Sequence, residues 1–288
     1  MWPAGFDTDG ELFCNQRYAN FPIRITDRAD RDPWADPDWM LLSSRAKATA
    51  SSEKHPAANA VQENIRTFWK AEESDKNPTL LLDLRAPMAV SAIQVNFADD
   101  LGMKAELPSG GKLFFDSLAP RYIDTNVHRT RWLLEGSLDG EKYRILADKR
   151  EADTDLPHDF VVLEEDAEFR YIRLQVIEMP YGQAAAVSGL RVFGRGHGAL
   201  PEQAKNVQAV RTSPLDMEVS FTADAVGCEI LWGHTPEKLY HSRQVIINGK
   251  SEVTQSIGAL VASEDTYYVR VDTFNENGIT HSQVHICV

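Results

Sequence analysis

The chain has 288 residues, of which 43% are hydrophobic and 9% aromatic, and this length indicates two domains at roughly 100 to 200 residues each. Its 43 acidic residues outnumber its 30 Lys and Arg, and the formal net charge of -13 disfavours nucleic acid and anionic membranes as partners. We find no run near the roughly 18 consecutive apolar residues of a membrane span, so we expect none. Residues 1–5 lack the start of a signal peptide, and if the natural product is secreted, this chain has lost its export signal.

The first 40 residues predict a turn and then a connector. Asp7 and Asp9 lie beside Gly10, a combination typical of a tight turn. Between residues 27 and 38, Asp, Arg and Pro dominate. This composition indicates a charged, turn-rich connector ahead of the first sandwich.

From about Leu41 onward the hydrophobic residues recur with a period of two, as in strands that bury one face. Three apolar sets share a predicted face: Ile93, Val95 and Phe97; Ile172, Leu174 and Val176; Met217, Val219 and Phe221. No long helical periodicity interrupts this pattern. The sequence therefore predicts an all-β chain.

Turn and linker signals divide the pattern. Three dipeptides predict tight hairpin turns, since their residues tolerate positive φ: Asp139-Gly140, Asn248-Gly249 and Asn277-Gly278. Residues 194–201 contain three glycines and a proline, which indicates an interdomain linker. The predicted parts are an N-terminal segment (1–40), a first sandwich (41–195), a linker (196–201) and a second sandwich (202–288).

Cysteine and histidine predict neither a disulfide framework nor a metal site. Cys14, Cys228 and Cys287 are too few for a framework; a Cys228 to Cys287 bridge is one alternative, and buried free thiols are the favoured one. His281 and His285 are four residues apart on a predicted strand, which separates them by roughly 13 Å. They therefore cannot share one zinc ion.

Five ordered blocks resemble the discoidin family, also called the coagulation-factor type C domain, whose galactose-binding-like members include the family 32 carbohydrate-binding modules. The blocks are Ala48–Ser52; His55–Val61 with Thr67–Trp69 and Leu82–Leu84; Glu135–Gly140; Tyr171–Leu174; and Leu190–Gly194. The resemblance implies an eight-stranded jelly-roll sandwich with Trp69 and Leu84 in its core.

Two further resemblances flank this one. Residues 202–288, with Ile230–Gly233, Tyr267–Val271 and Asn275–Gly278, resemble a fibronectin type III domain. Residues 2–12 and 15–18 are similar to the closing strands of the five-bladed propeller in family 43 glycoside hydrolases, some of which carry discoidin-like and fibronectin-like domains after the propeller. This order implies the C-terminal region of a larger glycosidase, and we expect that parent to be secreted or periplasmic.

Propeller strands without their neighbours must disorder or attach to another sheet edge. We expect deletion of residues 1–38 to leave the melting temperature of the sandwiches nearly unchanged.

The catalytic carboxylates of a family 43 enzyme would lie in the propeller, and the sequence after Leu41 offers no acid and base pair on a rigid scaffold. We therefore expect no catalytic residue in this chain.

The discoidin resemblance also implies a structural calcium ion in many relatives. Here Gln62 stands where the calcium loop usually has Asp, and Gly189 stands where a Glu usually lies, while Asn64 and Thr67 remain. Calcium prefers charged oxygen ligands, so the site is weakened. We expect no cofactor, with a structural calcium ion as the open alternative.

In discoidin folds, loops at one end of the sandwich bind the ligand, and residues 98–129 form an insertion of the length typical of functional loops. A sugar site needs an aromatic face for the ring and polar groups for its hydroxyls. The candidate sugar-binding residues are Tyr122, His128, Arg129, His55 and Tyr181. The alternative is that these side chains pack the loops onto the sandwich or onto the propeller.

The leading hypothesis is a non-catalytic accessory region of a glycoside hydrolase, in which the first sandwich binds a plant-type glycan or oligosaccharide and the second is a spacer. A second hypothesis is a structural module that packs against the catalytic propeller of the parent and binds no sugar. The third is an autonomous hydrolase with an unrecognised site.

Overall fold

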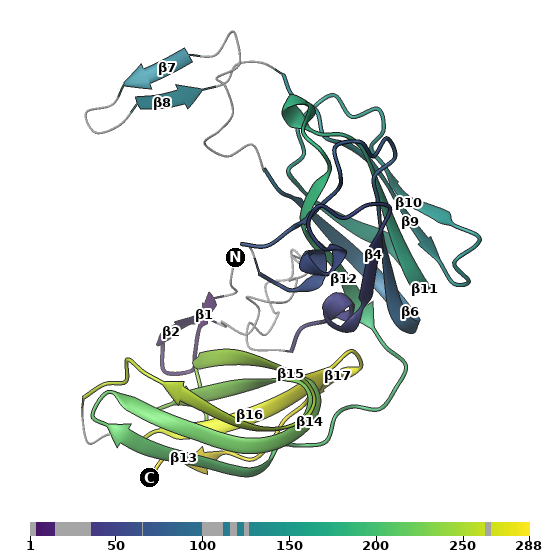
Figure 1. Ribbon diagram of the computed structural model, residues 1–288. Helices are drawn as coiled ribbons and strands as arrows, with labels where there is room; N and C mark the ends of the chain where they lie inside the picture. The colour runs from purple at the N-terminus through teal and green to yellow at the C-terminus, as the bar shows by residue number, and fades with distance from the viewer. Residues whose placement is uncertain are drawn as a thin grey trace. The chain divides into compact units, whose positions relative to one another are not determined.

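The computed structural model describes residues 4–14, 36–64, 66–99, 112–115, 120–123, 127–262 and 266–288. The chain divides into two compact units, which we describe separately. The central unit is Ala46–Val192, and the terminal unit combines Met1–Arg45 with Phe193–Val288. The architecture is all-β, as predicted, and Figure 1 shows the strands of both units.

The strands of the central unit belong to a sheet with the order β10-β9-β11-β6-β12-β3, with β4 on β6 and β5 on β12; β3 and the last residues of β12, from Phe193, are counted in the terminal unit. The strands of this sheet are β3 (Met40–Leu41), β4 (Lys47–Ala50), β5 (Trp69–Lys70), β6 (Thr79–Phe97), β9 (Arg131–Ser137), β10 (Arg144–Asp148), β11 (His158–Glu178) and β12 (Ala186–Arg195). The short β3 pairs with the last residues of β12, Phe193 and Gly194. A separate hairpin joins β7 (Lys112–Phe115) to β8 (Pro120–Ile123) within the predicted long loop.

Two long strands, β6 and β11, let this sheet fold over into a sandwich. In β6 the buried alternation stops at Arg85, which has φ 77°, and residues 85–87 are exposed. The register with β11 shifts twice, between Val162 and Ala167 and between Phe169 and Tyr171. Such irregularities bend a strand and increase its twist, so each long strand contributes to both layers.

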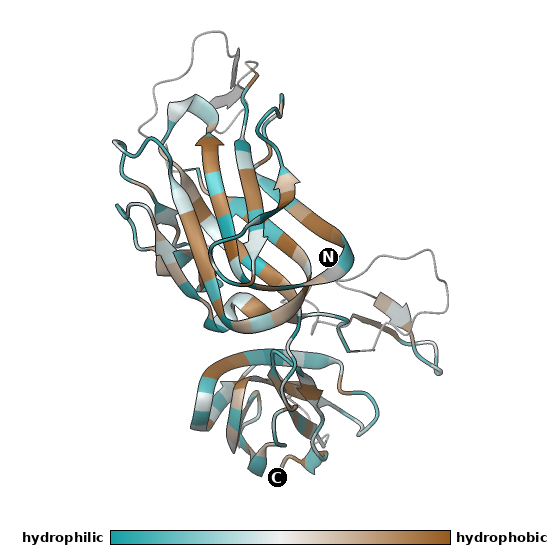
Figure 2. Cartoon of the chain, turned by 90° about the vertical axis from the view of Figure 1, so that its right-hand side faces the viewer, coloured by the Kyte–Doolittle hydropathy of each residue, from teal (hydrophilic) through white to brown (hydrophobic). Residues whose placement is uncertain are grey.

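The core of the central unit lies where the period-two pattern placed it. Trp69 is 0% exposed and Leu84 is 1% exposed, as the discoidin resemblance implied. Ile93, Val95 and Phe97 are all buried, whereas Gln94 and Asn96 on the other face are half-buried. Figure 2 shows this alternation as hydrophobic and hydrophilic bands along the strands.

Among the residues that the structure describes, the helical elements are short 3-10 turns: η2 (Leu42–Arg45), η3 (Ala57–Val61) and η5 (Pro180–Gly182). None of the helices in the described ranges has the length and apolar character needed to cross a membrane.

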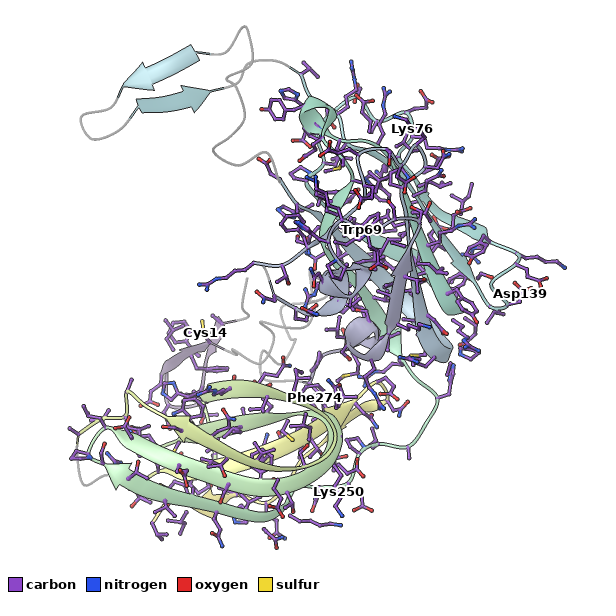
Figure 3. The ribbon with its side chains drawn as sticks, in the orientation of Figure 1. Cys14, Trp69, Lys76, Asp139, Lys250 and Phe274 are labelled. Atoms are coloured by element: carbon purple, nitrogen blue, oxygen red, sulfur yellow. The ribbon has the colours of Figure 1, made fainter. Side chains whose placement is uncertain are left out.

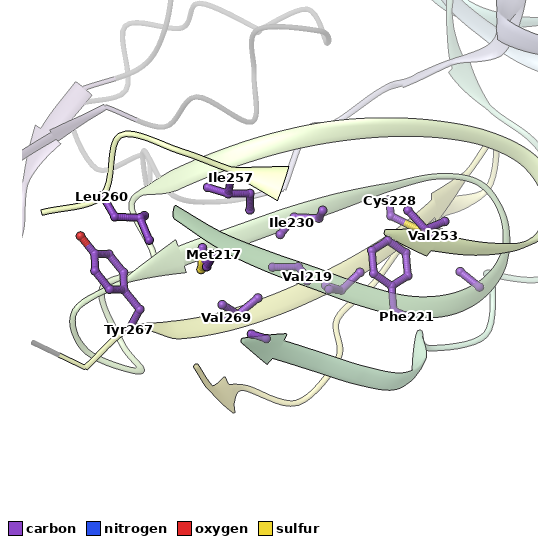
Figure 4. Packing of buried hydrophobic residues seen from close by; sticks show 13 residues of the cluster. Met217, Val219, Phe221, Cys228, Ile230, Val253, Ile257, Leu260, Tyr267 and Val269 are labelled. Atoms are coloured by element: carbon purple, nitrogen blue, oxygen red, sulfur yellow. The ribbon is translucent and has the colours of Figure 1, made fainter. Parts of the chain in front are cut away.

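In the terminal unit, a sheet with the order β13-β14-β16-β17 carries β15 on β14 and β18 on β16. Its strands are β13 (Lys205–Ser213), β14 (Asp216–Gly233), β15 (His241–Ile257), β16 (Tyr268–Asn275), β17 (Gly278–Thr280) and β18 (His285–Ile286). Residues from both halves of β14 meet in one buried cluster, including Met217, Val219 and Phe221 from the first half and Cys228 and Ile230 from the second (Figure 4). The sheet of the terminal unit therefore folds over on itself around this core.

One predicted turn is wrong. Asn248 and Gly249 have the expected positive φ values of 53° and 130°, but they lie inside β15 and do not separate two strands. The β14–β15 pairing shifts register beside them, between Ala225 and Gly227, and continues on both sides. The dipeptide thus forms the bend of a continuous strand. Gly140 and Gly278, by contrast, lie at strand-connecting turns as predicted.

The N-terminal hairpin belongs to the terminal unit. It pairs β1 (Ala4–Phe6) with β2 (Leu12–Cys14), and the Gly10 N–H closes its turn by donating to the carbonyl of Asp7 at 3.0 Å. Phe13 is 8% exposed and stacks on Tyr240, with ring centroids 4.8 Å apart, whereas Phe6 on the other face is 73% exposed.

Lys238 and Tyr240 bind the carboxylates in and beside the turn of this hairpin. The Lys238 Nζ lies 2.9 Å from Asp7, 2.7 Å from Asp9 and 2.7 Å from Glu11. The Tyr240 hydroxyl donates to Asp7 Oδ2 at 2.8 Å. Orphaned strands were expected to disorder or to attach to another sheet edge; within the described residues β1 and β2 pair with each other in a separate sheet, and side chains attach the hairpin.

Residues 195–199 are bound along the β16–β17 turn. The Gly198 N–H donates to Asn277 Oδ1 at 2.8 Å, and Asn277 Nδ2 donates to the carbonyl of Ala199 at 2.8 Å. Arg195 donates to the carbonyls of Pro37 and Asp38 at 2.9 and 3.0 Å. The predicted linker is therefore fixed over these residues, although the domain boundaries as such stay a prediction.

All three cysteines are free: Cys14 is exposed, Cys228 is buried and Cys287 is partly buried. This corresponds to the favoured alternative, buried free thiols, for Cys228. Burial raises the pKa of the Cys228 thiol to about 12.

Candidate functional site

Four loops meet at one end of the central unit. β4 ends at Ala50 opposite Leu80 near the start of β6, and β11 ends at Glu178 opposite Arg131, where β9 begins. Backbone hydrogen bonds join the loops themselves, because the Ser51 N–H donates to the carbonyl of Thr79 at 2.9 Å and the Ala71 N–H donates to that of Ala185 at 2.9 Å. The antiparallel register thus gathers residues 51–55, 71–78, 127–130 and 179–185 at this end.

A cleft of about 460 Å³ opens between these loops. It is lined by Lys70, Glu72, Glu73, Asp75, Lys76, Pro78, Val176, Ile177, Glu178, Met179, Gly182, Gln183, Ala184 and Ala185. Val176 and Met179 are buried and supply an apolar floor, and the charged residues form the rim. Figure 3 labels Lys76, one of the lining residues, and Trp69 in the same unit.

The charges of the cleft balance one another. Four carboxylates line it, against two lysines, and two of the carboxylates pair with cations outside the lining: Glu73 with Lys54 at 2.8 Å, and Glu178 with Arg131 at 3.1 Å. Counting those partners, four acidic groups meet four basic ones. The cleft therefore favours an uncharged polar ligand over an ion.

Asp75 organises the wall of the cleft. Its Oδ2 accepts hydrogen bonds from the hydroxyls of Ser51 at 2.5 Å and Ser52 at 2.7 Å, and these bonds lower the pKa of the Asp75 carboxyl. Trp69 Nε1 donates to the carbonyl of Ser52 at 2.9 Å, which ties this wall to the core. Sequence reasoning missed Asp75, whose signal is the turn-rich, charged run at residues 72–78 between two strands.

Tyr181 stands beside the cleft in an unusual backbone conformation. It has φ 59° and ψ 13°, the left-handed region, and it is 46% exposed. Gly182, which follows it and lines the cleft, has φ 67°. A bulky residue at positive φ is strained by about 1 kcal/mol or more and persists where the surroundings impose it. Tyr181 is itself outside the lining, and the 3-10 turn places it between the lining residues Met179 and Gly182.

His128 meets Tyr181 from a loop far away in the sequence. Their ring centroids are 4.1 Å apart, with an interplanar angle of 38°. His128 is half-buried, while Arg129 next to it is exposed. The structure thus brings two of the five predicted sugar-binding residues into contact.

The other predicted residues lie in different surroundings. The His55 ring packs against Phe68, with ring centroids 4.8 Å apart. The backbone N–H of His55 donates to the carbonyl of the cleft residue Lys70 at 3.1 Å. Tyr122 lies on β8 opposite Leu113, and its side chain is outside the described residues. His55 therefore supports the wall of the cleft.

The residues at the implied calcium loop do not fit that ion. Asn64 Oδ1 accepts from the Arg66 N–H at 3.0 Å, and the Asn64 carbonyl accepts from Thr67 Oγ1 at 3.1 Å, so the loop is closed by its own hydrogen bonds. Beside it, Arg191 pairs with Glu63 at 2.9 Å. A guanidinium group on the loop carboxylate opposes a second cation.

No family model matches the chain, and no curated protein matches it. Solved structures with a similar fold include a family 32 carbohydrate-binding module of a Clostridium perfringens family 89 protein, at 15% identity and a TM-score of 0.40, covering 54% of this chain and 99% of the module. Another is the family 32 module of Clostridium perfringens NanJ, in complex with galactose, at 20% identity and a TM-score of 0.38, covering 53% and 96%.

A third is chitosan-binding module 1 from a chitosanase/glucanase of a Paenibacillus species, at 14% identity and a TM-score of 0.40, covering 54% of this chain and 98% of the module. The all-β architecture of this chain is established by its own strands.

Proposed function

We propose that the central unit binds a neutral carbohydrate at the cleft, as a non-catalytic accessory module of a glycoside hydrolase. The observation that carries the proposal is the exposed Tyr181, held in a left-handed conformation between the cleft residues Met179 and Gly182. Strained backbone conformations are found at ligand sites as well as at the strand bends described above, and Tyr181 lies in a loop beside a cleft and not at a strand bend.

The cleft and the ring supply the two kinds of contact that a sugar needs. The apolar C–H face of a pyranose packs on an aromatic ring, and its hydroxyls exchange hydrogen bonds with charged and amide side chains. Tyr181 offers the ring, and Glu72, Lys76 and Gln183 lie among the polar lining. Because the charges balance, a neutral glycan of the plant type fits better than a sulfated or uronic one.

Retention on insoluble arabinoxylan and binding to a glycan array test the proposal. We expect Tyr181→Ala to lose at least about fivefold in affinity, since a stacking contact with an aromatic ring is worth about 1 kcal/mol or more. Tyr181→Phe keeps the stacking face and should retain most binding.

Tyr143→Ala is the matched control, because Tyr143 is an aromatic residue that follows β9 at its far end and stacks under Arg173 there. It should bind like the wild type. Equal binding by Tyr181→Ala and the wild type, with both folded by circular dichroism, would refute the assignment of the ring.

A second function is favoured by the N-terminal hairpin. Ala4, Phe6, Leu12 and Cys14 form one face of that hairpin and all are exposed. An apolar sheet face suits packing against another sheet, which agrees with a module that braces a catalytic propeller of the family 43 type. On this view the second sandwich, with its fibronectin-like pattern, is a spacer in a secreted or periplasmic parent.

The two functions make different predictions for the chain by itself. A bracing module shows no affinity on a broad glycan array, and Phe6→Ser with Leu12→Ser then weakens association with the parent's propeller. Hydrolysis of aryl xylosides or arabinofuranosides that follows the protein through purification would contradict both.

A further inference from the structure

Arg191 on β12 joins the loop that follows η3 to the neighbouring strand β6. Its Nε donates to Glu63 Oε1 at 3.0 Å and its Nη2 lies 2.9 Å from Glu63 Oε2, so the ion pair is bidentate. Its Nη1 donates to Gln94 Oε1 on β6 at 2.9 Å. The two charged side chains are 17% and 33% exposed, so water and salt screen this pair less than a pair on the open surface. We call residues 62–64 and 66–67 the Glu63 loop.

The backbone of the Glu63 loop needs a contact that holds it. Gln62 ends the 3-10 turn with φ -86° and ψ -2°, and Glu63 then has φ 54°, in the left-handed region. This conformation is unfavourable for a residue with a Cβ atom, and it persists where other contacts outweigh the strain. The charge-assisted hydrogen bonds from Arg191 to the Glu63 carboxylate are contacts of that kind.

The strand beside the loop has no room for a carboxylate side chain at position 189. Gly189 lies two residues before Arg191, on the same face of β12. A Cβ at Gly189 would lie 2.9 Å from Asn96 Nδ2 on β6, so the glutamate that the discoidin resemblance implied there would have to displace the Asn96 side chain. This face of β12 therefore presents a guanidinium group in place of a carboxylate.

The guanidinium group of Arg191 acts on the loop as a structural cation would. It neutralises the Glu63 carboxylate, and its planar N–H groups orient oxygens from both the loop and the strand β6. The pair carries no net charge. A divalent ion that approached the same carboxylate would be repelled by the fixed positive charge of Arg191 at close range.

We propose that Arg191 is a built-in cation, which replaces the structural calcium ion implied by the discoidin resemblance and holds the Glu63 loop without any metal. The loop leads to Phe68, whose ring packs on His55, and Lys70 two residues further on lines the cleft. Arg191 is thus a positioning residue for that wall, which keeps its shape when divalent cations are removed. The inference concerns the loop and stands whether or not the cleft binds sugar.

The first test asks whether the full chain uses calcium. After divalent ions have been removed on a chelating resin, thermal unfolding and hydrogen exchange are compared in EDTA and in millimolar calcium chloride. We expect the same melting temperature of the central unit and the same exchange of the Glu63 loop in both. A calcium site of the native state would raise that melting temperature by several degrees and slow the exchange.

The second test removes the planar fork but keeps the charge. Arg191→Lys presents one ammonium group, which cannot reproduce the bidentate contact with Glu63. We expect it to lower the melting temperature of the central unit by about 3–6 °C and to speed exchange of the Glu63 loop at least about tenfold. Glu63→Gln should do the same, and the double variant should lose little more than either single one, because both changes remove one interaction.

Arg173→Lys is the matched control, because it makes the same change in an ion pair elsewhere on the sheet. Arg173 on β11 pairs with Glu135 on β9 at 2.8 Å. The variant should lower the melting temperature, which identifies the transition of the central unit. Exchange of the Glu63 loop, corrected for global stability, should stay as in the wild type.

Two results would overturn the proposal. One is that calcium raises the melting temperature of the central unit and protects the Glu63 loop of the wild type, with EDTA reversing both effects. The other is exchange of the Glu63 loop that Arg191→Lys leaves unchanged. That outcome would show that the hydrogen bonds of Asn64 and Thr67 hold the loop without the guanidinium group.

Discussion

Replacing Phe13 by Ala tests whether the N-terminal hairpin is an integral part of the terminal unit. Phe13 is 8% exposed and stacks on Tyr240, whereas Phe6 on the opposite face of the same hairpin is 73% exposed. Full burial of a Phe side chain is worth about 1.5–3 kcal/mol, and an aromatic pair adds about 0.5–1.5 kcal/mol. We therefore expect Phe13→Ala to lower the free energy of unfolding of the terminal unit by about 2–4.5 kcal/mol.

Phe6→Ala is the matched control and should change the stability by less than about 0.5 kcal/mol, as exposed substitutions do. The assay is urea unfolding followed by intrinsic fluorescence, with the terminal unit's transition identified by its response to Tyr240→Ala. If Phe13→Ala unfolds at the same urea concentration as Phe6→Ala, the hairpin contributes nothing and residues 1–38 are dispensable, as the sequence alone led us to expect.

Two further predictions follow from the same unit. Gly196→Ala should destabilise the terminal unit by about 1–3 kcal/mol in thermal unfolding, because a Cβ at Gly196 would lie 2.3 Å from Asn277 Oδ1. Gly10→Ala is the control: a Cβ there would meet nothing within 4 Å, so the loss of stability should come only from the strain of an alanine at positive φ. The ammonium group of Lys238 holds the pKa of Asp7 well below 3.8, so the hairpin should be fully docked above pH 3.8 and should detach as the pH falls through the lowered pKa. Quenching of Tyr240 fluorescence measures this detachment. An acid transition that Lys238→Met leaves unchanged would contradict the role of the ion pairs.

Period-two patterning predicted the strands because it depends on local alternation alone. Ile93, Leu174 and Val219 are buried where the pattern placed them. Asn248-Gly249 shows the limit of local signals, since the dipeptide has the backbone angles of a turn but its partner β14 continues past it. Pairing across the sheet therefore decided whether those angles ended the strand or bent it.

The site was predictable only in part, for a related reason. Tyr181 and His128 were candidates because aromatic residues in loops suit sugars, and their contact confirms nothing about sugar itself. The cleft joins residues 70–78 to residues 176–185, and no local pattern brings these together. The strain at Tyr181 is equally invisible in the sequence, because tyrosine has no preference for positive φ.

The left-handed Tyr181 also bears on how much freedom a ligand would remove. A side chain on a mobile loop loses conformational entropy when a ligand orders it, at a cost of about 0.5–1.5 kcal/mol. The Tyr181 ring is already positioned by the 3-10 turn and by His128, so folding has absorbed that loss before any ligand arrives. Such a preorganised platform gains affinity but adapts poorly, and it should discriminate between sugars by the shape of their apolar face.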